Sequence, residues 1–118
     1  MEDSELVQMA VDLVYERNYV SFVELEFFLW APHFDVKGDY AITLDTNENI
    51  VFWSDVSERF SRLFNLLEGH DKVKLAPTDY WAYLIDRCVL RLPLVKTMRN
   101  YKKPHWLPVV VCRRDGRR

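Results

Sequence analysis

The periodicity of apolar residues changes at Gly38, and this change limits the chain to a mixed fold. Residues 4–18 place apolar side chains at the spacing of an amphipathic helix, with Ser4 as its expected N-cap. Residues 40–53 instead contain two short runs of β-branched and aromatic residues around a polar stretch, which predicts a β-hairpin. Helical spacing returns after residue 55. We therefore expect an α+β domain with four or five helices and a hairpin at residues 40–53.

The remaining pattern predicts several short elements. A second helix is expected at residues 23–30, and Pro32 discourages its continuation. Asp55 and Glu58 have the spacing of a capping box, so a third helix should begin there and end at Gly69 in a left-handed conformation. The other expected elements are a strand at residues 73–75, helices at 77–87 and 93–103, and a strand at 107–113.

The order helix, strand, helix and then β structure is predicted twice along the chain. A shift of 53 residues aligns the two apolar patterns, Val20 with Val73 for example. We expect one compact domain over residues 1–118, with two sub-units that share a core: an acidic unit at 4–54, which packs or dimerises, and a unit at 55–118 with a basic end. This order resembles that of winged-helix domains at the level of architecture, without a matching family motif. The resemblance implies a recognition helix and a β wing in the second unit.

Charge is divided unequally along the chain. Residues 1–86 contain 17 of the 18 acidic side chains and only six Lys and Arg, a formal net charge of −11. Residues 87–118 contain ten basic side chains and a single acid, Asp115, a net charge of +9. Such asymmetry is typical of a chain whose basic region meets a polyanion. The alternative is that the basic end lies against the acidic half of the same chain.

The best local indication of function is the helix expected at residues 93–103. At 100° per residue, Leu94, Met98 and Tyr101 fall on one face, and basic and amide side chains fall on the opposite face. Cations on such a face can hold phosphates, and Arg or Asn can make paired hydrogen bonds to a guanine or an adenine. The candidate nucleic-acid-binding residues are Arg91, Lys96, Arg99, Asn100, Lys103, Arg113 and Arg114. An ordinary solvated basic helix is the alternative interpretation.

Two further features flank this basic segment. His105 and Trp106 are expected either at a wing tip, where the Trp ring would stack on a base, or at the edge of the core. Arg117 and Arg118 would form a flexible tail that follows a phosphate backbone.

The sequence therefore predicts a small DNA-binding protein, a transcriptional regulator of winged-helix type. Its helix at residues 93–103 and its basic C-terminus would contact the phosphates of duplex DNA. The same interpretation allows a homodimer of the chain. The alternative is an acidic protein–protein interaction module or inhibitor without nucleic-acid binding, because the carboxylates of residues 1–86 repel DNA.

Other classes of function have little support in the sequence. The three histidines are far apart, and the chain has no glycine-rich phosphate loop, no G-x-S-x-G and no C-x-x-C. We therefore expect no enzyme, no metal and no cofactor, with Cys88 and Cys112 reduced. The longest uncharged apolar run, residues 27–31, is too short to span a membrane, and the acidic N-terminus is unlike a signal peptide. A cytoplasmic protein without a membrane segment is expected.

Overall fold

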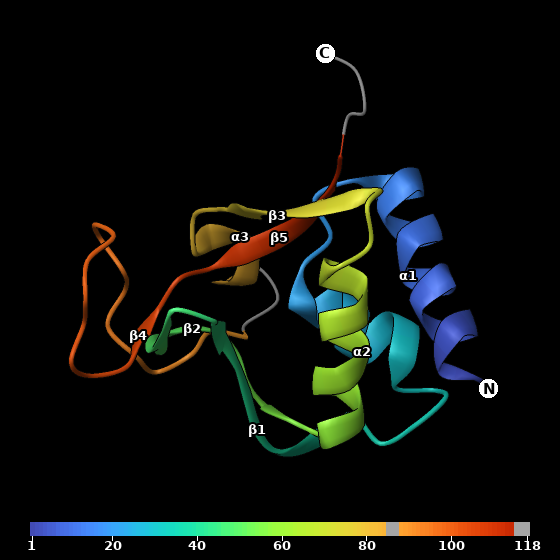
Figure 1. The fold of residues 1–118 in the computed structure, drawn as a ribbon, viewed down its shortest axis with the longest axis horizontal. Coiled ribbons are helices and arrows are strands. Elements are labelled where there is room, and N and C mark those ends of the chain that lie inside the picture. Colours follow the sequence, from blue (N-terminus) through green and yellow to red (C-terminus); the bar gives the residue numbers. More distant parts are fainter. Residues whose placement is uncertain (85–87, 115–118) are drawn as a thin grey trace.

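Two small β-sheets pack beside two longer helices (Figure 1). The structure is a computed structural model that describes residues 1–84 and 88–114. It confirms the predicted α+β class. Along the chain the elements are α1 (Asp3–Arg17), the π-helix η1 (Glu24–Trp30), β1 (Lys37–Leu44), β2 (Asn47–Val56), α2 (Glu58–Glu68), β3 (Val73–Pro77), α3 (Trp81–Leu84), β4 (His105–Trp106) and β5 (Val109–Arg113).

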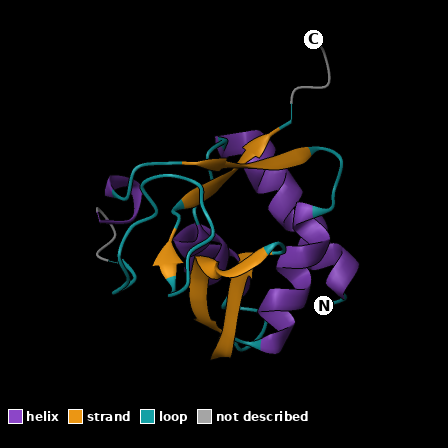
Figure 2. Ribbon diagram, turned by 60° about the vertical axis from the view of Figure 1, so that its left-hand side comes forward, coloured by secondary structure: helices purple, strands orange, loops and turns teal. Residues whose placement is uncertain are grey.

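The strands form one three-stranded sheet and one two-stranded sheet. In the first, β1 and β2 form an antiparallel hairpin and β4 runs parallel to β2. This confirms the hairpin predicted at residues 40–53, although both strands extend beyond it. In the second, β5 pairs antiparallel with β3, and a bridge from Val20 to Val111 adds an edge on its other side. Figure 2 shows the long helices on one side of the sheets and loop segments on the other.

Stacked aromatic rings join the helices to both sheets. Phe22, which precedes η1, stacks on Trp53 of β2, with ring centroids 5.8 Å apart and planes 4° apart. The Tyr83 hydroxyl donates a hydrogen bond to the Val109 carbonyl oxygen at 2.6 Å and accepts one from the Phe22 amide at 3.1 Å. Burial raises the pKa of Tyr83 well above its ordinary value. Trp106 lies against this group, with its ring 5.5 Å from that of Tyr83.

A buried carboxylate ties η1 to the hairpin. The helix predicted at residues 23–30 is present as a π-helix, and its Glu26 side chain is 0% exposed. Trp53 Nε1 donates a hydrogen bond to Glu26 Oε1 at 2.8 Å. Lys37 Nζ lies 3.0 Å from Glu26 Oε2, an ion pair in which Oε2 does not accept a well-directed hydrogen bond. A buried charge is tolerated because both partners approach it.

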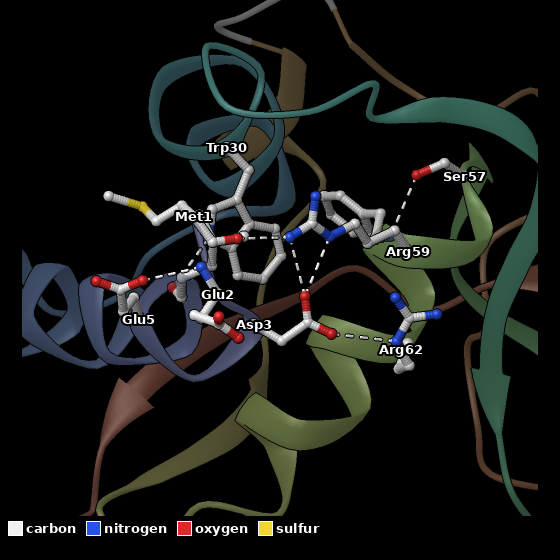
Figure 3. A network of polar contacts seen from close by, with 10 residues as sticks. Met1, Glu2, Asp3, Glu5, Trp30, Ser57, Arg59 and Arg62 are labelled. Carbon is white, nitrogen blue, oxygen red and sulfur yellow. Dashed lines mark hydrogen bonds and ion pairs between the residues drawn. The ribbon is translucent and has the colours of Figure 1, made fainter.

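Arginines of α2 hold the beginning of α1 in place (Figure 3). Arg59 Nε donates a hydrogen bond to Asp3 Oδ1 at 3.1 Å, and its terminal nitrogen donates to the Met1 carbonyl oxygen at 2.9 Å. Arg62 Nε lies 3.3 Å from Asp3 Oδ2. The hydrogen bond from Arg59, more than any other contact, lowers the pKa of Asp3 below its ordinary value. Arg59 also covers the Phe34 ring at 4.9 Å.

Several predicted helix ends are wrong. The capping box of α1 uses Glu2 rather than Ser4. Asp55 lies within β2 with a φ of 60°, and the hydroxyl of Ser57 caps α2 instead by accepting a hydrogen bond from a first-turn amide. Gly69 does end α2, but with a φ of −77°, in the right-handed rather than the left-handed region. The helix predicted at residues 77–87 is described only as the four-residue α3, and residues 85–87 lie outside the described part.

Candidate nucleic-acid interface

The helix predicted at residues 93–103 is wrong. This segment belongs to an irregular stretch between α3 and β4 that projects away from the long helices (Figure 1). We call residues 91–105 the basic loop. The Val95 amide donates a hydrogen bond to the Trp106 carbonyl oxygen at 2.8 Å, and the Trp106 amide donates to the Pro93 carbonyl oxygen at 2.8 Å. These strand-like bonds to β4 exclude a helix there and override the local apolar spacing.

The Tyr101 side chain bonds back to residues 96 and 97 and so closes a turn within the basic loop. Its hydroxyl donates a hydrogen bond to the Thr97 carbonyl oxygen at 2.7 Å and accepts one from the Lys96 amide at 3.3 Å. Burial acts to raise the pKa of this hydroxyl, but the hydrogen bonds from the Thr97 and Lys96 amides and the contact with Arg99 outweigh it. The pKa of Tyr101 therefore lies below its ordinary value. The loop is irregular but internally bonded.

Aromatic and basic groups gather around Tyr101. The His105 ring stacks on the Tyr101 ring, with centroids 4.0 Å apart, and the Arg99 guanidinium lies 4.9 Å from the same ring centroid. Two open clefts of about 550 and 350 Å³ adjoin these three side chains. Lys96 lines the larger cleft, and Lys103 lines the smaller one. Exposed cations thus surround a buried aromatic ring on one loop.

Among the residues that the structure describes, the cations of the basic loop make no ion pair with the acidic half. The loop carries five basic side chains and no acidic one. All five are exposed, and within residues 1–84 and 88–114 none of them forms an ion pair. They are Arg91, Lys96, Arg99, Lys102 and Lys103. By contrast, Arg17, Lys37, Arg59 and Arg62 of the acidic half each pair with a carboxylate.

Asn100 makes a hydrogen bond within the protein, whereas the sequence suggested that its amide could bond to a base. Its Oδ1 accepts a hydrogen bond from Asn47 Nδ2 at 3.2 Å, and the neighbouring Tyr101 carbonyl oxygen accepts one from Asn49 Nδ2 at 3.1 Å. Both donors belong to β2. Asn100 therefore anchors the basic loop to the hairpin.

Arg113 and Arg114 lie apart from the basic loop, at the far end of β5 (Figure 1). The Arg113 guanidinium donates a hydrogen bond to the Tyr15 carbonyl oxygen at 2.8 Å, and Arg114 Nε donates to the Val73 carbonyl oxygen at 3.2 Å. The structure brings Lys96, Arg99 and Lys103 together in one loop but does not bring these two arginines to it. The predicted tail residues 117–118 lie outside the described residues.

The prediction that Trp106 lies at a wing tip is wrong. The alternative, that Trp106 belongs to the core, is correct. Its side chain is 1% exposed, and Nε1 donates a hydrogen bond to the Phe52 carbonyl oxygen at 3.2 Å. Trp106 therefore anchors the basic loop to the core rather than contacting a ligand. His105, beside it, is half-buried under the Tyr101 ring.

A third cleft, of about 390 Å³, was not foreseen from the sequence. It lies between the turn that precedes α3 and residues 94–98 of the basic loop. Tyr80 contributes to its lining from the turn, and Leu94 and Met98 contribute from the loop. Tyr80 lies in the turn before the four-residue α3, whereas the sequence predicts that a longer helix includes it. The available signal for this cleft in the sequence was the adjacent aromatic pair Tyr80 and Trp81. In the structure their rings stack, with centroids 5.3 Å apart.

Over the described ranges 1–84 and 88–114, no group of three His, Cys, Asp or Glu side chains is placed to hold a metal ion. Cys112 is buried in β5, where burial raises the pKa of its thiol, and Cys88 is half-buried. No helix in the described part of the chain is long and apolar enough to cross a membrane.

The fold and the site together define a small α+β domain that displays a basic loop beside an apolar cleft. Comparison with known proteins adds nothing to this description, because no protein-family model, curated protein or solved structure matches the chain.

Proposed function

We propose that this protein binds nucleic acid through the basic loop, with phosphate contacts as the main source of affinity. The observation that carries the proposal is the set of five exposed loop cations without ion pairs among the described residues. Cations already paired with carboxylates would lose those partners on binding a phosphate, but these would not. The internal bonds of Tyr101 also reduce the ordering that the loop must undergo on binding.

Contacts from this loop favour the backbone over the bases. An irregular loop does not present a helix to the major groove, so the proposed contacts position the nucleic acid without reading its sequence. Duplex DNA therefore serves as a first ligand, and regulation of transcription is the role that we propose for such binding. Homodimerisation through the acidic unit stays a prediction, as does the absence of enzymatic activity.

The test compares two double variants that lose the same charge. Lys96→Ala with Arg99→Ala removes two cations of the loop, and Lys72→Ala with Lys74→Ala removes two exposed cations next to and within β3. Two lost phosphate contacts should lower the affinity for a random duplex at low salt by at least about tenfold. The control pair should change the affinity by less than about threefold, because it alters only the net charge. Fluorescence anisotropy with a labelled duplex measures both.

Two outcomes would count against the proposal. If both double variants weaken binding equally, the effect follows net charge and the loop is not the binding site. If the parent does not bind at low salt, the acidic protein–protein interaction module becomes the better account. That account is supported by the formal charge of −11 carried by residues 1–86.

A further inference from the structure

The third cleft, the one between Tyr80 and the basic loop, is better suited to a nucleotide than to a bare phosphate. Its walls are largely apolar, with the Tyr80 ring on one side and Leu94, Met98 and Pro108 on the others. Lys96 lines the same cleft and connects it to the cations of the loop. The volume of about 390 Å³ lies within the usual range for small-molecule sites. An apolar slot next to a cation matches a flat base attached to a phosphate.

Exposed apolar side chains around the cleft strengthen this match. Trp81, stacked on Tyr80, is 58% exposed, and Met98 is 63% exposed. Aromatic side chains beside a cationic groove are the usual means of holding unpaired bases, because every base has a face that can stack. Asp79 also lines the cleft. Its carboxylate disfavours a phosphate there, but it can accept a hydrogen bond from the amino or imino group of a base.

We propose that this cleft binds an unpaired nucleobase of single-stranded nucleic acid, while the flanking phosphates lie on the basic loop. The inference rests on the proposed function, since it assigns a substrate class to the same site. A base within a duplex cannot enter the cleft without being unpaired and unstacked, which costs free energy. Single strands therefore bind more tightly than duplexes of the same length.

The experiment uses three labelled probes of about 12 nucleotides, a length within the usual range for single-strand sites. The first is oligothymidine, the second is an abasic strand with the same number of phosphates, and the third is a duplex of mixed sequence. We expect the 118-residue chain to bind oligothymidine about 5- to 150-fold more tightly than the abasic strand, the range for stacking of one base on an aromatic side chain.

Variants then assign this difference to the cleft. Tyr80→Ala should bring the affinity for oligothymidine close to that for the abasic strand and leave the affinity for the abasic strand unchanged. Tyr80→Phe keeps the ring and should retain the preference. Tyr40→Ala, which removes an exposed tyrosine of β1 outside the cleft, should behave as the parent does. If Tyr80→Ala does not fold, loss of the preference in Tyr80→Phe would still count against stacking on this ring, because the ring is kept there.

The failure of this inference is distinguishable from the failure of the proposed function. If the parent binds oligothymidine and the abasic strand equally and Lys96→Ala with Arg99→Ala weakens both, the phosphate site stands and the base site is wrong. If none of the three probes binds at low salt, the proposed function itself is wrong. Self-association that Tyr80→Ala abolishes, without any preference for bases, would assign the cleft to a second copy of the chain and overturn the inference.

Discussion

The bond between Glu26 and Trp53 should show a large coupling free energy in a double-mutant cycle. Both side chains are buried, and the indole Nε1 is 2.8 Å from Glu26 Oε1. Trp53→Phe removes the donor, and Glu26→Leu removes the acceptor together with its charge. Each single variant leaves a polar group of the partner inside the core without that hydrogen bond, whereas the double variant removes both groups.

The geometry sets the expected magnitudes. A hydrogen bond to a charged group contributes about 1.5–3 kcal/mol, so the coupling free energy should lie in that range. Trp53→Phe should cost about 2.5–4 kcal/mol, because the smaller ring also loses packing worth about 1 kcal/mol. Glu26→Leu should cost less, about 1–2 kcal/mol, because removal of a buried charge offsets part of the loss. The double variant should be no less stable than Trp53→Phe alone.

Urea unfolding followed by circular dichroism measures the four free energies of unfolding, with unchanged m-values as the condition for comparing them. Tyr101→Phe is the control, because its hydroxyl donates to the Thr97 carbonyl oxygen in the basic loop and makes no contact with Glu26 or Trp53. Combined with Glu26→Leu it should be additive within about 0.5 kcal/mol. A coupling free energy below about 0.5 kcal/mol for Glu26 and Trp53 would refute the reasoning.

Three further predictions follow from other polar contacts. Tyr83→Phe leaves a buried amide and a buried carbonyl oxygen without their partner, so the free energy of unfolding should fall by about 2–4 kcal/mol in urea. Asp3→Asn should cost about 0.5 kcal/mol at neutral pH. Because the pKa of Asp3 is lowered from 3.8 in the folded state, this difference should disappear as the pH falls below that value, and an undiminished difference would contradict it. Tyr101→Phe should speed hydrogen exchange at the Lys96 and Thr97 amides while leaving the β5 amides protected, as NMR would measure.

Elements whose apolar pattern is long and regular were predictable from the sequence. The helix α1, the hairpin of β1 and β2, and the strand β5 follow their periodicity, because their apolar faces pack against the core in the way that the spacing requires. The helix expected at residues 93–103 failed because contacts distant in sequence compete with it. The bonds between Val95 and Trp106 and the hydrogen bonds of the Tyr101 hydroxyl are not encoded in the local spacing.

The candidate site was predictable in its charges but not in its shape. The sequence correctly indicated that Lys96, Arg99 and Lys103 are exposed, since a segment without acids and rich in cations stays in solvent. The cleft between Tyr80 and Met98 depends on how the α3 turn meets the basic loop. That meeting is a property of the tertiary fold, so no local pattern could indicate it.

The most direct test of the central claim is the salt dependence of binding to a random DNA duplex. If about three to five phosphates are met by the loop, the slope of log K against log salt concentration should lie between about −2.7 and −4.5. The affinity should then fall by about 40- to 500-fold between 50 mM and 200 mM salt. An affinity that is the same at both concentrations, or no binding at the lower one, would contradict the account.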